Sequence, residues 1–334
     1  MYFQEMSLVN KQIRSFLLFA CLSLGSISLF AQEWAIVEAS GEVEARRDNG
    51  FMSCKGKFYL IGGRGHHPVN IFDPSTGTWS QGAYPPVEMH HFQAIRIEDE
   101  IWVLGAFTGE YPDEEPLEHI YIYNTETDQW RRGDPIPEDR QRGSAGVAVY
   151  RERIYLICGV TDLYDTEITS WIDRYDPKTG KWKKLADAPR NRGHFHAGIC
   201  NGKIYAAGGS SPSGSGLDNS GTLIADVDVY DIASGKWSSL PEEQNLPTPR
   251  AACATVNIMD HIVVIGGESP DQEEAFRQVE AYDTERGAWE KWDSLENGRG
   301  GTQAFMCVGA VFVTAGSRDY KGSLASTSLE MFAF

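Results

Sequence analysis

The sequence lacks the patterns that would mark a disulfide framework, a zinc site or a nucleic-acid surface. Its six cysteines include no CxxC pair and no metal-ligand spacing. Cys54, Cys200 and Cys307 share one repeated position in apolar segments, which favours free, buried thiols. The formal net charge of −17 argues against binding to nucleic acid or to an anionic membrane surface.

Only one long apolar run is present, and it lies near the N-terminus. Residues 16–30 follow Lys11 and Arg14 and precede Ala31. Basic residues, then an apolar run, then a small residue are typical of a secretory signal peptide, and the run is short for a membrane span. We therefore expect residues 1–31 to be a signal peptide and the chain to have no membrane span.

The remaining residues, 32–334, contain no linker-like break. We expect them to form one domain that is exported to the periplasm or outside the cell and acts as a monomer. The tetrapeptide from Leu18 to Cys21 resembles a lipoprotein box, which leaves anchoring at Cys21 as a less favoured alternative. Translation could begin at Met1 or at Met6, because both precede the apolar run.

A repeated unit runs through these residues. Each copy begins with a short apolar strand that ends in two small residues: Gly62-Gly63, Gly105-Ala106, Cys158-Gly159, Gly208-Gly209, Gly266-Gly267 and Ala315-Gly316. Five copies continue with an aromatic residue and, seven positions later, a tryptophan: Phe72/Trp79, Tyr123/Trp130, Tyr175/Trp182, Tyr230/Trp237 and Tyr282/Trp289. Turn-forming residues lie between the two, which predicts a hairpin.

The sixth copy is incomplete, and its missing part lies at the other end of the sequence. Phe332 has no tryptophan after it, whereas Trp34 precedes the first copy. One sheet cannot bury both its faces alone, so the units must pack in a ring. The period and the aromatic/Trp spacing resemble the kelch repeat. The resemblance implies an all-β, six-bladed kelch β-propeller whose last blade is closed by the N-terminal strand.

A second register precedes the small pairs by sixteen residues. Five of its six positions are arginine, and the sixth is methionine: Arg46, Met89, Arg142, Arg192, Arg250 and Arg299. These positions enter the innermost strands, so the arginines could ring one mouth of the channel and bind an anionic ligand. The alternative is structural, because arginine at this position can also bond carbonyl groups between blades.

Histidines occur where the arginine register fails. His90 and His91 follow Met89, and His194 is the equivalent of His91 in the fourth unit. We expect His90, His91 and His194 to join the arginines in binding ligand. The catalytic acid or base is left open between four candidates: His91, His194, Glu268 and Tyr111. No metal site and no cofactor are predicted.

The resemblance extends to exported bacterial kelch proteins of the N-acetylneuraminate mutarotase/epimerase type. It implies binding of an acidic, carboxylated sugar or glycan, with mutarotase activity as the leading enzymatic option. Two alternatives stay open: a non-catalytic kelch module that binds glycan, protein or peptide, and a uronate-type polysaccharide lyase. A radical copper oxidase is excluded, because the Tyr-His pair that such enzymes need is absent.

Overall fold

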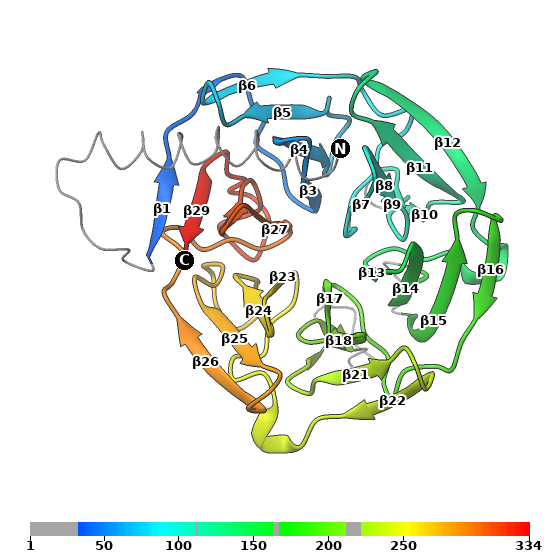
Figure 1. The fold of residues 1–334 in the computed structure, drawn as a ribbon. Helices are drawn as coiled ribbons and strands as arrows, with labels where there is room; N and C mark the ends of the chain where they lie inside the picture. The colour runs from blue at the N-terminus through cyan, green and yellow to red at the C-terminus, as the bar shows by residue number, and fades with distance from the viewer. Residues whose placement is uncertain (1–32, 111–112, 163–166, 212–221) are drawn as a thin grey trace.

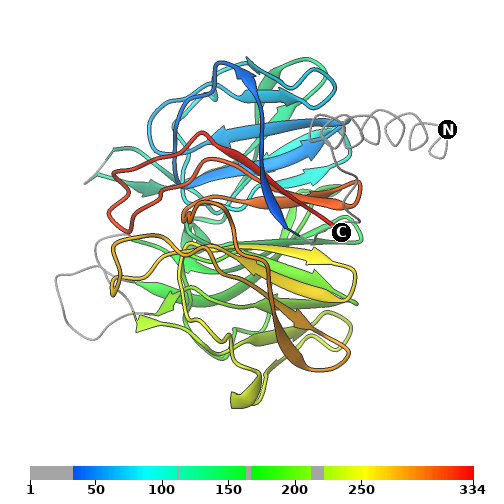
Figure 2. The same cartoon turned by 90° about the vertical axis from the view of Figure 1, so that its left-hand side faces the viewer.

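The computed structural model describes residues 33–110, 113–162, 167–211 and 222–334. The described chain forms six antiparallel blades of four strands, arranged in chain order around a central axis (Figure 1). In side view the inner strands of the blades run roughly along this axis (Figure 2), whereas the outer strands lie across it and are seen lengthwise in Figure 1. The predicted all-β, six-bladed propeller is therefore confirmed.

Blades 1 to 3 follow one another from the N-terminal side. Blade 1 contains β3 (Asn49–Cys54), β4 (Lys57–Gly62), β5 (Asn70–Asp73) and β6 (Thr78–Gln81), with β2 (Ser40–Gly41) parallel to β6. Blade 2 contains β7 (Ile95–Ile97), β8 (Glu100–Val103), β11 (His119–Asn124) and β12 (Gln129–Pro135). Blade 3 contains β13 (Gly146–Tyr150), β14 (Arg153–Val160), β15 (Ile168–Asp176) and β16 (Lys181–Lys184).

Blades 4 to 6 complete the ring. Blade 4 contains β17 (Ala197–Cys200), β18 (Lys203–Ala206), β21 (Asp228–Asp231) and β22 (Lys236–Ser239). Blade 5 contains β23 (Ala254–Ile258), β24 (His261–Ile265), β25 (Val279–Asp283) and β26 (Ala288–Trp292). Blade 6 contains β27 (Ala304–Cys307), β28 (Ala310–Val313), β29 (Leu329–Ala333) and, from the N-terminal side, β1 (Trp34–Val37).

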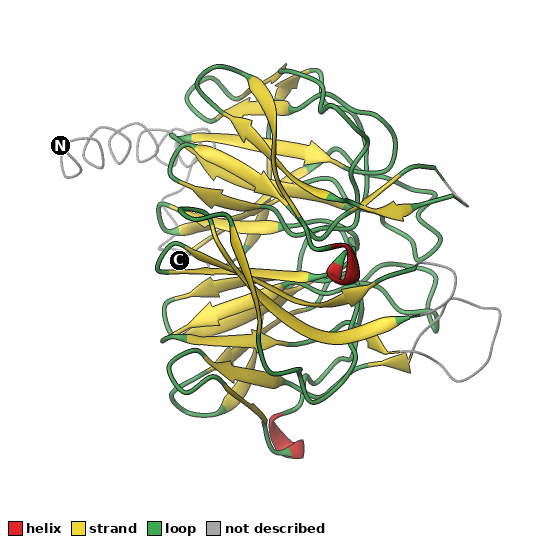
Figure 3. Cartoon of the chain, turned by 90° about the vertical axis from the view of Figure 1, so that its right-hand side faces the viewer, coloured by secondary structure: helices red, strands yellow, loops and turns green. Residues whose placement is uncertain are grey.

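The remaining elements are short. Two small hairpins extend from blades 2 and 4: β9 (Phe107–Thr108) with β10 (Glu115–Pro116), and β19 (Ser210–Ser211) with β20 (Thr222–Leu223). Two 3₁₀ turns, η1 (Glu138–Arg140) and η2 (Glu242–Gln244), are the only helical segments in the described chain (Figure 3).

The core is divided into seams between neighbouring blades. In the seam between blades 6 and 1, the ring centroid of Phe58 lies 4.9 Å from that of Phe305 and 4.6 Å from that of Phe312. Each blade contributes apolar side chains from both faces of its sheet to two such seams, which explains the nearly continuous apolar inner strands.

The last blade closes in the way that the tryptophan count predicts. Trp34 pairs with Phe332 across β1 and β29, and their ring centroids are 5.6 Å apart. The five complete units place their aromatic and tryptophan in the same cross-strand relationship, as in Tyr175 and Trp182 at 4.8 Å. This pairing joins the two ends of the ring and covers an edge that would otherwise be open.

The cysteines are also as expected. The five cysteines of the described chain are free, and Cys54, Cys158, Cys200 and Cys253 are buried, while Cys307 is partly buried. Burial raises the pKa of the thiols of Cys158 and Cys253, which keeps them protonated and unreactive.

Candidate functional site at the propeller axis

The five arginines of the repeat are buried inside the blades. Each has an exposed fraction of 0 to 2%: Arg46, Arg142, Arg192, Arg250 and Arg299. Burial lowers the pKa of Arg46 and Arg142 to about 10, and both remain charged at neutral pH. Buried charges need acceptors close by, and the blades supply them.

The sixteen-residue spacing corresponds to a hydrogen bond. In four blades the guanidinium donates to the carbonyl oxygen of the first small residue, sixteen positions on: Arg46 to Gly62, Arg142 to Cys158, Arg192 to Gly208 and Arg299 to Ala315. In blade 5, Arg250 donates instead to the carbonyl of Val264 at 3.1 Å. The arginines therefore satisfy buried carbonyl groups at the ends of the second strands.

Each arginine also contacts a polar side chain on the third strand of its own blade. These partners lie two positions before the repeat aromatic: Asn70, Asp173, Asp228, Glu280 and Glu330. In blade 2 the equivalent position is Tyr121, and Tyr121 and Met89 belong to one apolar cluster. The cation and its polar partner are thus absent together, as expected for a structural pair within the blade.

The expected role of these arginines needs correction. Their guanidinium groups are enclosed by carbonyl and carboxylate oxygens, so they do not line an accessible mouth. The structural alternative accounts for all five positions and for the exception at Met89.

Six residues, each two positions after a position of the arginine register, form a closed ring around the axis. All have left-handed φ angles between +50° and +64°: Asp48, His91, Ser144, His194, Ala252 and Gly301. The backbone N–H of each donates to the carbonyl oxygen of the ring residue in the preceding blade, at 2.5 to 3.1 Å. Left-handed backbone is uncommon outside glycine, and this belt of hydrogen bonds stabilises it.

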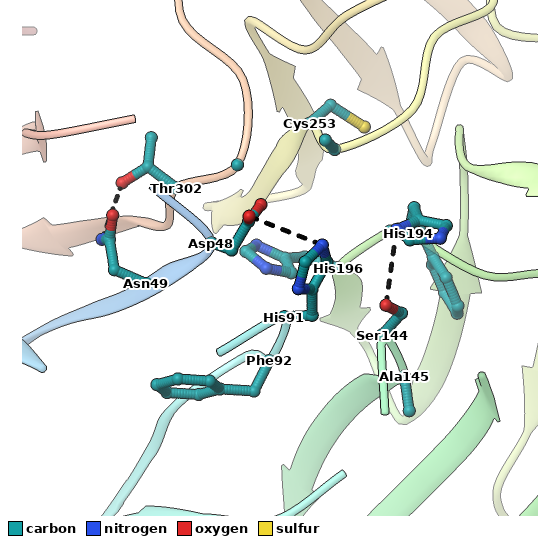
Figure 4. A pocket seen from close by; sticks show the side chains of 13 residues that line it. Asp48, Asn49, His91, Phe92, Ser144, Ala145, His194, His196, Cys253 and Thr302 are labelled. Carbon is teal, nitrogen blue, oxygen red and sulfur yellow. Dashed lines mark hydrogen bonds and ion pairs between the residues drawn. The ribbon is translucent and has the colours of Figure 1, made fainter. Parts of the chain in front are cut away.

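A small pocket, partly open to solvent, lies at this ring (Figure 4). Besides the ring residues, Asn49, Phe92, Phe195, His196 and Thr302 contribute to its wall. The wall is asymmetric, because blades 5 and 6 present only Ala252 and Gly301 where the other blades present polar side chains. Its enclosed volume is about 30 Å³, room for about two water molecules, so a larger ligand would have to lie mainly in the open part of the pocket.

Two glutamines tie the inner strands together further along the axis. Gln93 accepts from the backbone N–H groups of Val147 and Ala197, both at 2.8 Å. Gln303 accepts from the N–H of Ala94 at 2.9 Å and donates to the carbonyl of the same residue at 2.8 Å. These bridges fix the spacing of the blades beneath the pocket, so the pocket is held by a rigid scaffold.

Asp48 is the centre of a charged network at the mouth. Its Oδ2 lies 3.1 Å from Nε of Arg64, 3.3 Å from Nη1 of Arg47 and 3.5 Å from Nε2 of His91. Arg64 also forms an ion pair with the buried carboxylate of Glu114. The side chains of Arg47 and Arg64 remain 30% and 26% exposed, so both cations of this network reach solvent, and Arg64 is the one already paired with Glu114.

The two predicted histidines meet across the ring. The ring centroids of His91 and His194 are 5.5 Å apart, and Nδ1 of His194 lies 3.3 Å from Oγ of Ser144. Burial lowers the pKa of both imidazoles, and the nearby His90 and Arg64 lower that of His91 further. Both rings are therefore neutral at neutral pH and able to accept a proton.

Glu268 approaches Asp48 from blade 5. Oε2 of Glu268 lies 2.9 Å from the position of a Cβ added at Gly300, and Oδ1 of Asp48 lies 2.6 Å from that of a Cβ added at Gly301. The two glycines therefore leave room for two carboxyl groups. Burial and the charge of Asp48, opposed by Arg47, raise the pKa of Glu268 to about 8. Glu268 is thus largely protonated at neutral pH.

The structure places the other predicted residues less centrally. His90 is fully buried behind His91, and neither His90 nor Glu268 lines the pocket itself. Tyr111 lies outside the described residues. Asp48, Ser144 and the neighbouring Arg47 were not found from the sequence. Counting two positions on from the arginine register would have identified Asp48 and Ser144.

Potential metal ligands in the described chain gather away from the axis. Only His261, Asp283 and Glu290, in blade 5, bring three ligand atoms within 4.8 Å of one another among the described residues. Arg286 already pairs with both of these carboxylates, at 3.1 and 2.8 Å. The same described residues include no helix that is long and apolar enough to cross a membrane.

Blades with repeated aromatic/Trp pairs around a polar axial pocket define a β-propeller binding scaffold. A family model described as Attractin/LZTR1 beta-propeller matches residues 23–267, and one described as Kelch motif matches residues 249–291. The first match covers more than half of the chain. The chain therefore belongs to the kelch-repeat β-propeller family.

Individual relatives agree with this assignment. The chain is 27% identical to "Kelch-like protein terF" of Aspergillus terreus, over 74% of this chain and 54% of the relative. It is 26% identical to human "Kelch-like protein 23", over 79% of this chain and 44% of the relative. The chain thus spans about half the length of these curated relatives. A solved structure titled "Structure of YjhT" aligns with a TM-score of 0.70 at 14% identity, over 85% of this chain and 94% of that one, which shows the fold alone.

Proposed function

We propose that the axial pocket binds a monosaccharide and that the protein interconverts its anomers or epimers by acid–base catalysis. The observation that carries this proposal is the opposite protonation of Glu268, whose pKa the nearby Asp48 raises, and of two histidines that line the pocket. Glu268, with a pKa near 8, is a neutral acid at neutral pH, whereas His91 and His194 are neutral bases. Environments that separate acid and base in this way are typical of catalytic sites.

The reaction needs only proton transfers. One histidine takes the proton of the anomeric hydroxyl. The bond from the anomeric carbon to the ring oxygen then breaks as the carbonyl forms, and Glu268 protonates the released ring oxygen. Closure on the opposite face of the carbonyl, with both transfers reversed, gives the other anomer. The acid and the base return to their starting states, so no cofactor or co-reactant is consumed.

The proposal includes selection of an acidic sugar. The residues that select it are not the arginines of the repeat that the sequence predicted. The five buried arginines are occupied within their blades. Arg47, which is partly exposed beside Asp48, is the cation that can meet a ligand carboxylate. Ser144, Asn49 and Thr302 offer polar groups to sugar hydroxyls, and Phe92 adds an apolar surface.

Export, a signal peptide at residues 1–31 and a monomeric state belong to the same proposal. Export and the signal peptide rest on the sequence of residues 1–31, which lie outside the described residues. An exported protein that acts on a free monosaccharide would need neither a membrane span nor a second domain for this chemistry.

The test is a thermal-shift screen with N-acetylneuraminate, glucuronate, galacturonate and their neutral counterparts, followed by NMR. Exchange between anomer signals, faster with protein than without, is the expected result. A sugar that binds without exchange would favour the non-catalytic module, and a new double bond formed from polygalacturonate, supplied as a separate substrate, would favour the lyase. Failure of every sugar to bind would overturn the proposal.

Variants connect any activity to the pocket. Glu268→Gln and His91→Gln should each lower exchange at least about 100-fold, the usual contribution of a positioned acid or base. Glu118→Gln is the matched control, because Glu118 is an exposed carboxylate on blade 2. Equal loss in Glu118→Gln would mean that the effect does not come from the axial site.

A further inference from the structure

His90 is a buried histidine that the proposed reaction does not use. Its side chain is fully buried, and its ring lies between His91 and the loop that contains Gly109. Backbone hydrogen bonds in both directions with Phe107 fix its position, at 3.0 and 2.9 Å. A side chain held so firmly against a candidate base can control which nitrogen of that base carries the proton.

The first hydrogen bond of His90 fixes its own tautomer. Its Nε2 lies 3.2 Å from the carbonyl oxygen of Gly109, and a carbonyl oxygen can only accept. Nε2 of His90 therefore carries a proton. Burial and the charge of Arg64 lower the pKa of His90, so the ring is neutral and its Nδ1 has a lone pair. Glu114, 3.7 Å from the same Nε2, also favours a proton there.

The second hydrogen bond passes this constraint to His91. Nδ1 of His90 lies 2.7 Å from Nδ1 of His91, and only one proton fits between them. Because Nδ1 of neutral His90 accepts, Nδ1 of His91 must donate. The Nε2 atom of His91, on the side of Asp48 and the pocket, is then left without a proton.

We propose that His90 is a positioning residue that holds His91 as the Nδ1–H tautomer, so that Nε2 of His91 is the proton acceptor of the pocket. The assignment of the tautomer rests on the hydrogen bonds alone. The use of Nε2 as the base rests on the proposed function. It also selects His91 over His194, whose Nδ1 faces a hydroxyl that can donate or accept.

The other groups around His91 do not fix its tautomer as His90 does. Asp48 would favour a proton on Nε2, but at 3.5 Å it is further from His91 than His90 is, and it already accepts from Arg64 and contacts Arg47. His194 packs edge-on against His91 and has its own partner in Ser144. The contact with His90 is therefore the shortest polar contact of the His91 ring.

The test is NMR of the protein labelled with ¹⁵N-histidine, with His91 assigned by its loss in His91→Gln. At pH 7.5 we expect His91 to show a protonated Nδ1 and an unprotonated Nε2. A proton on Nε2 of His91 in the wild-type spectrum would overturn the proposal. This result depends on no ligand and no turnover, so it is separate from the success or failure of the proposed function.

Two variants of His90 extend the test. His90→Asn keeps an acceptor near the position of Nδ1 and should keep the tautomer of His91, whereas His90→Leu removes the acceptor and should move the proton towards Nε2 and Asp48. If a sugar is turned over, His90→Leu should lower kcat about ten-fold or more with KM unchanged, and His90→Asn should restore it. An unchanged tautomer in His90→Leu would show that His90 does not control it. Should His90→Leu fail to fold, the wild-type spectrum still decides.

Discussion

His91 contacts Asp48 twice, once through its backbone and once through its side chain. Its backbone N–H donates to the carbonyl oxygen of Asp48 at 2.8 Å, and its Nε2 lies 3.5 Å from Oδ2 of the same residue. The first contact belongs to the belt that fixes the blades around the axis. The second joins a histidine of blade 2 to the charged network of blade 1. The scaffold and the chemistry of the pocket thus share the same pair of residues.

Asp48→Asn tests the electrostatic part of this relationship. The negative charge of Asp48 raises the pKa of Glu268, so its removal should lower that pKa while leaving the backbone belt intact. The measurement is a ¹³C NMR titration of the Glu268 carboxyl in both proteins. An unchanged midpoint in Asp48→Asn would mean that the charge of Asp48 does not contribute to the raised pKa of Glu268.

Glu268→Gln should change how stability depends on pH. The pKa of Glu268 is about 8 in the folded protein against 4.5 for an ordinary glutamic acid, so the folded state holds a proton that the unfolded state loses. The free energy of unfolding contributed by this group is therefore complete below pH 4.5 and declines as the pH rises towards 8.

Melting temperatures at intervals between pH 5 and pH 8 measure this effect. The difference between Glu268→Gln and wild type should grow in favour of the variant as the pH rises. Glu118→Gln should show no such trend, because Glu118 is exposed. A constant difference for Glu268→Gln would contradict the raised pKa.

Arg250→Ala should destabilise the fold rather than only weaken binding. It would leave the carboxylate of Glu280, which is 6% exposed, without its cation inside blade 5. Breaking a buried pair in this way typically lowers the free energy of unfolding by about 3–5 kcal/mol. Urea denaturation of Arg250→Ala and wild type measures the loss.

The Met89/Tyr121 pair of blade 2 suggests the control for this variant. Replacing both partners by Arg250→Met and Glu280→Tyr copies the apolar arrangement of blade 2. The double variant should be more stable than Arg250→Met alone, because no unpaired carboxylate remains. If the two substitutions are simply additive, Arg250 and Glu280 do not act as a pair.

The sequence was sufficient to predict the blades because the residues that pack each blade recur in every repeat. The aromatic/Trp pairs specify the outer hairpins, and Trp34 facing an unpaired Phe332 specifies the closure. The arginine register was found but assigned the wrong role, since a spacing along the chain does not show which groups face the guanidinium. The polar residues two positions before each aromatic supply that information, because they are the partners that face the arginines.

The axial site was predicted only in part for a different reason. His91, His194 and Glu268 were named, but their setting depends on Asp48 and Arg47 from another blade, and sequence distance hides that proximity. Residue type does not mark the left-handed ring either, because residues as different as Ser144 and Ala252 adopt it; only its place two positions after the arginine register does. Tyr111 stays a prediction.

Ala252→Leu tests whether ligands bind on the small-residue side of the pocket. Ala252 is a ring residue of the pocket wall and already has a φ angle of +50°, so a longer side chain needs no new backbone conformation. Leucine should fill the space beside Gly301 and abolish the thermal shift of every sugar that stabilises the wild type. Ala252→Ser, which adds one oxygen, should retain these shifts.

The melting temperature without ligand should stay close to wild type in both variants, because the added atoms enter a cavity rather than a packed seam. Retention of sugar binding by a folded Ala252→Leu would place the binding site away from this side of the axis.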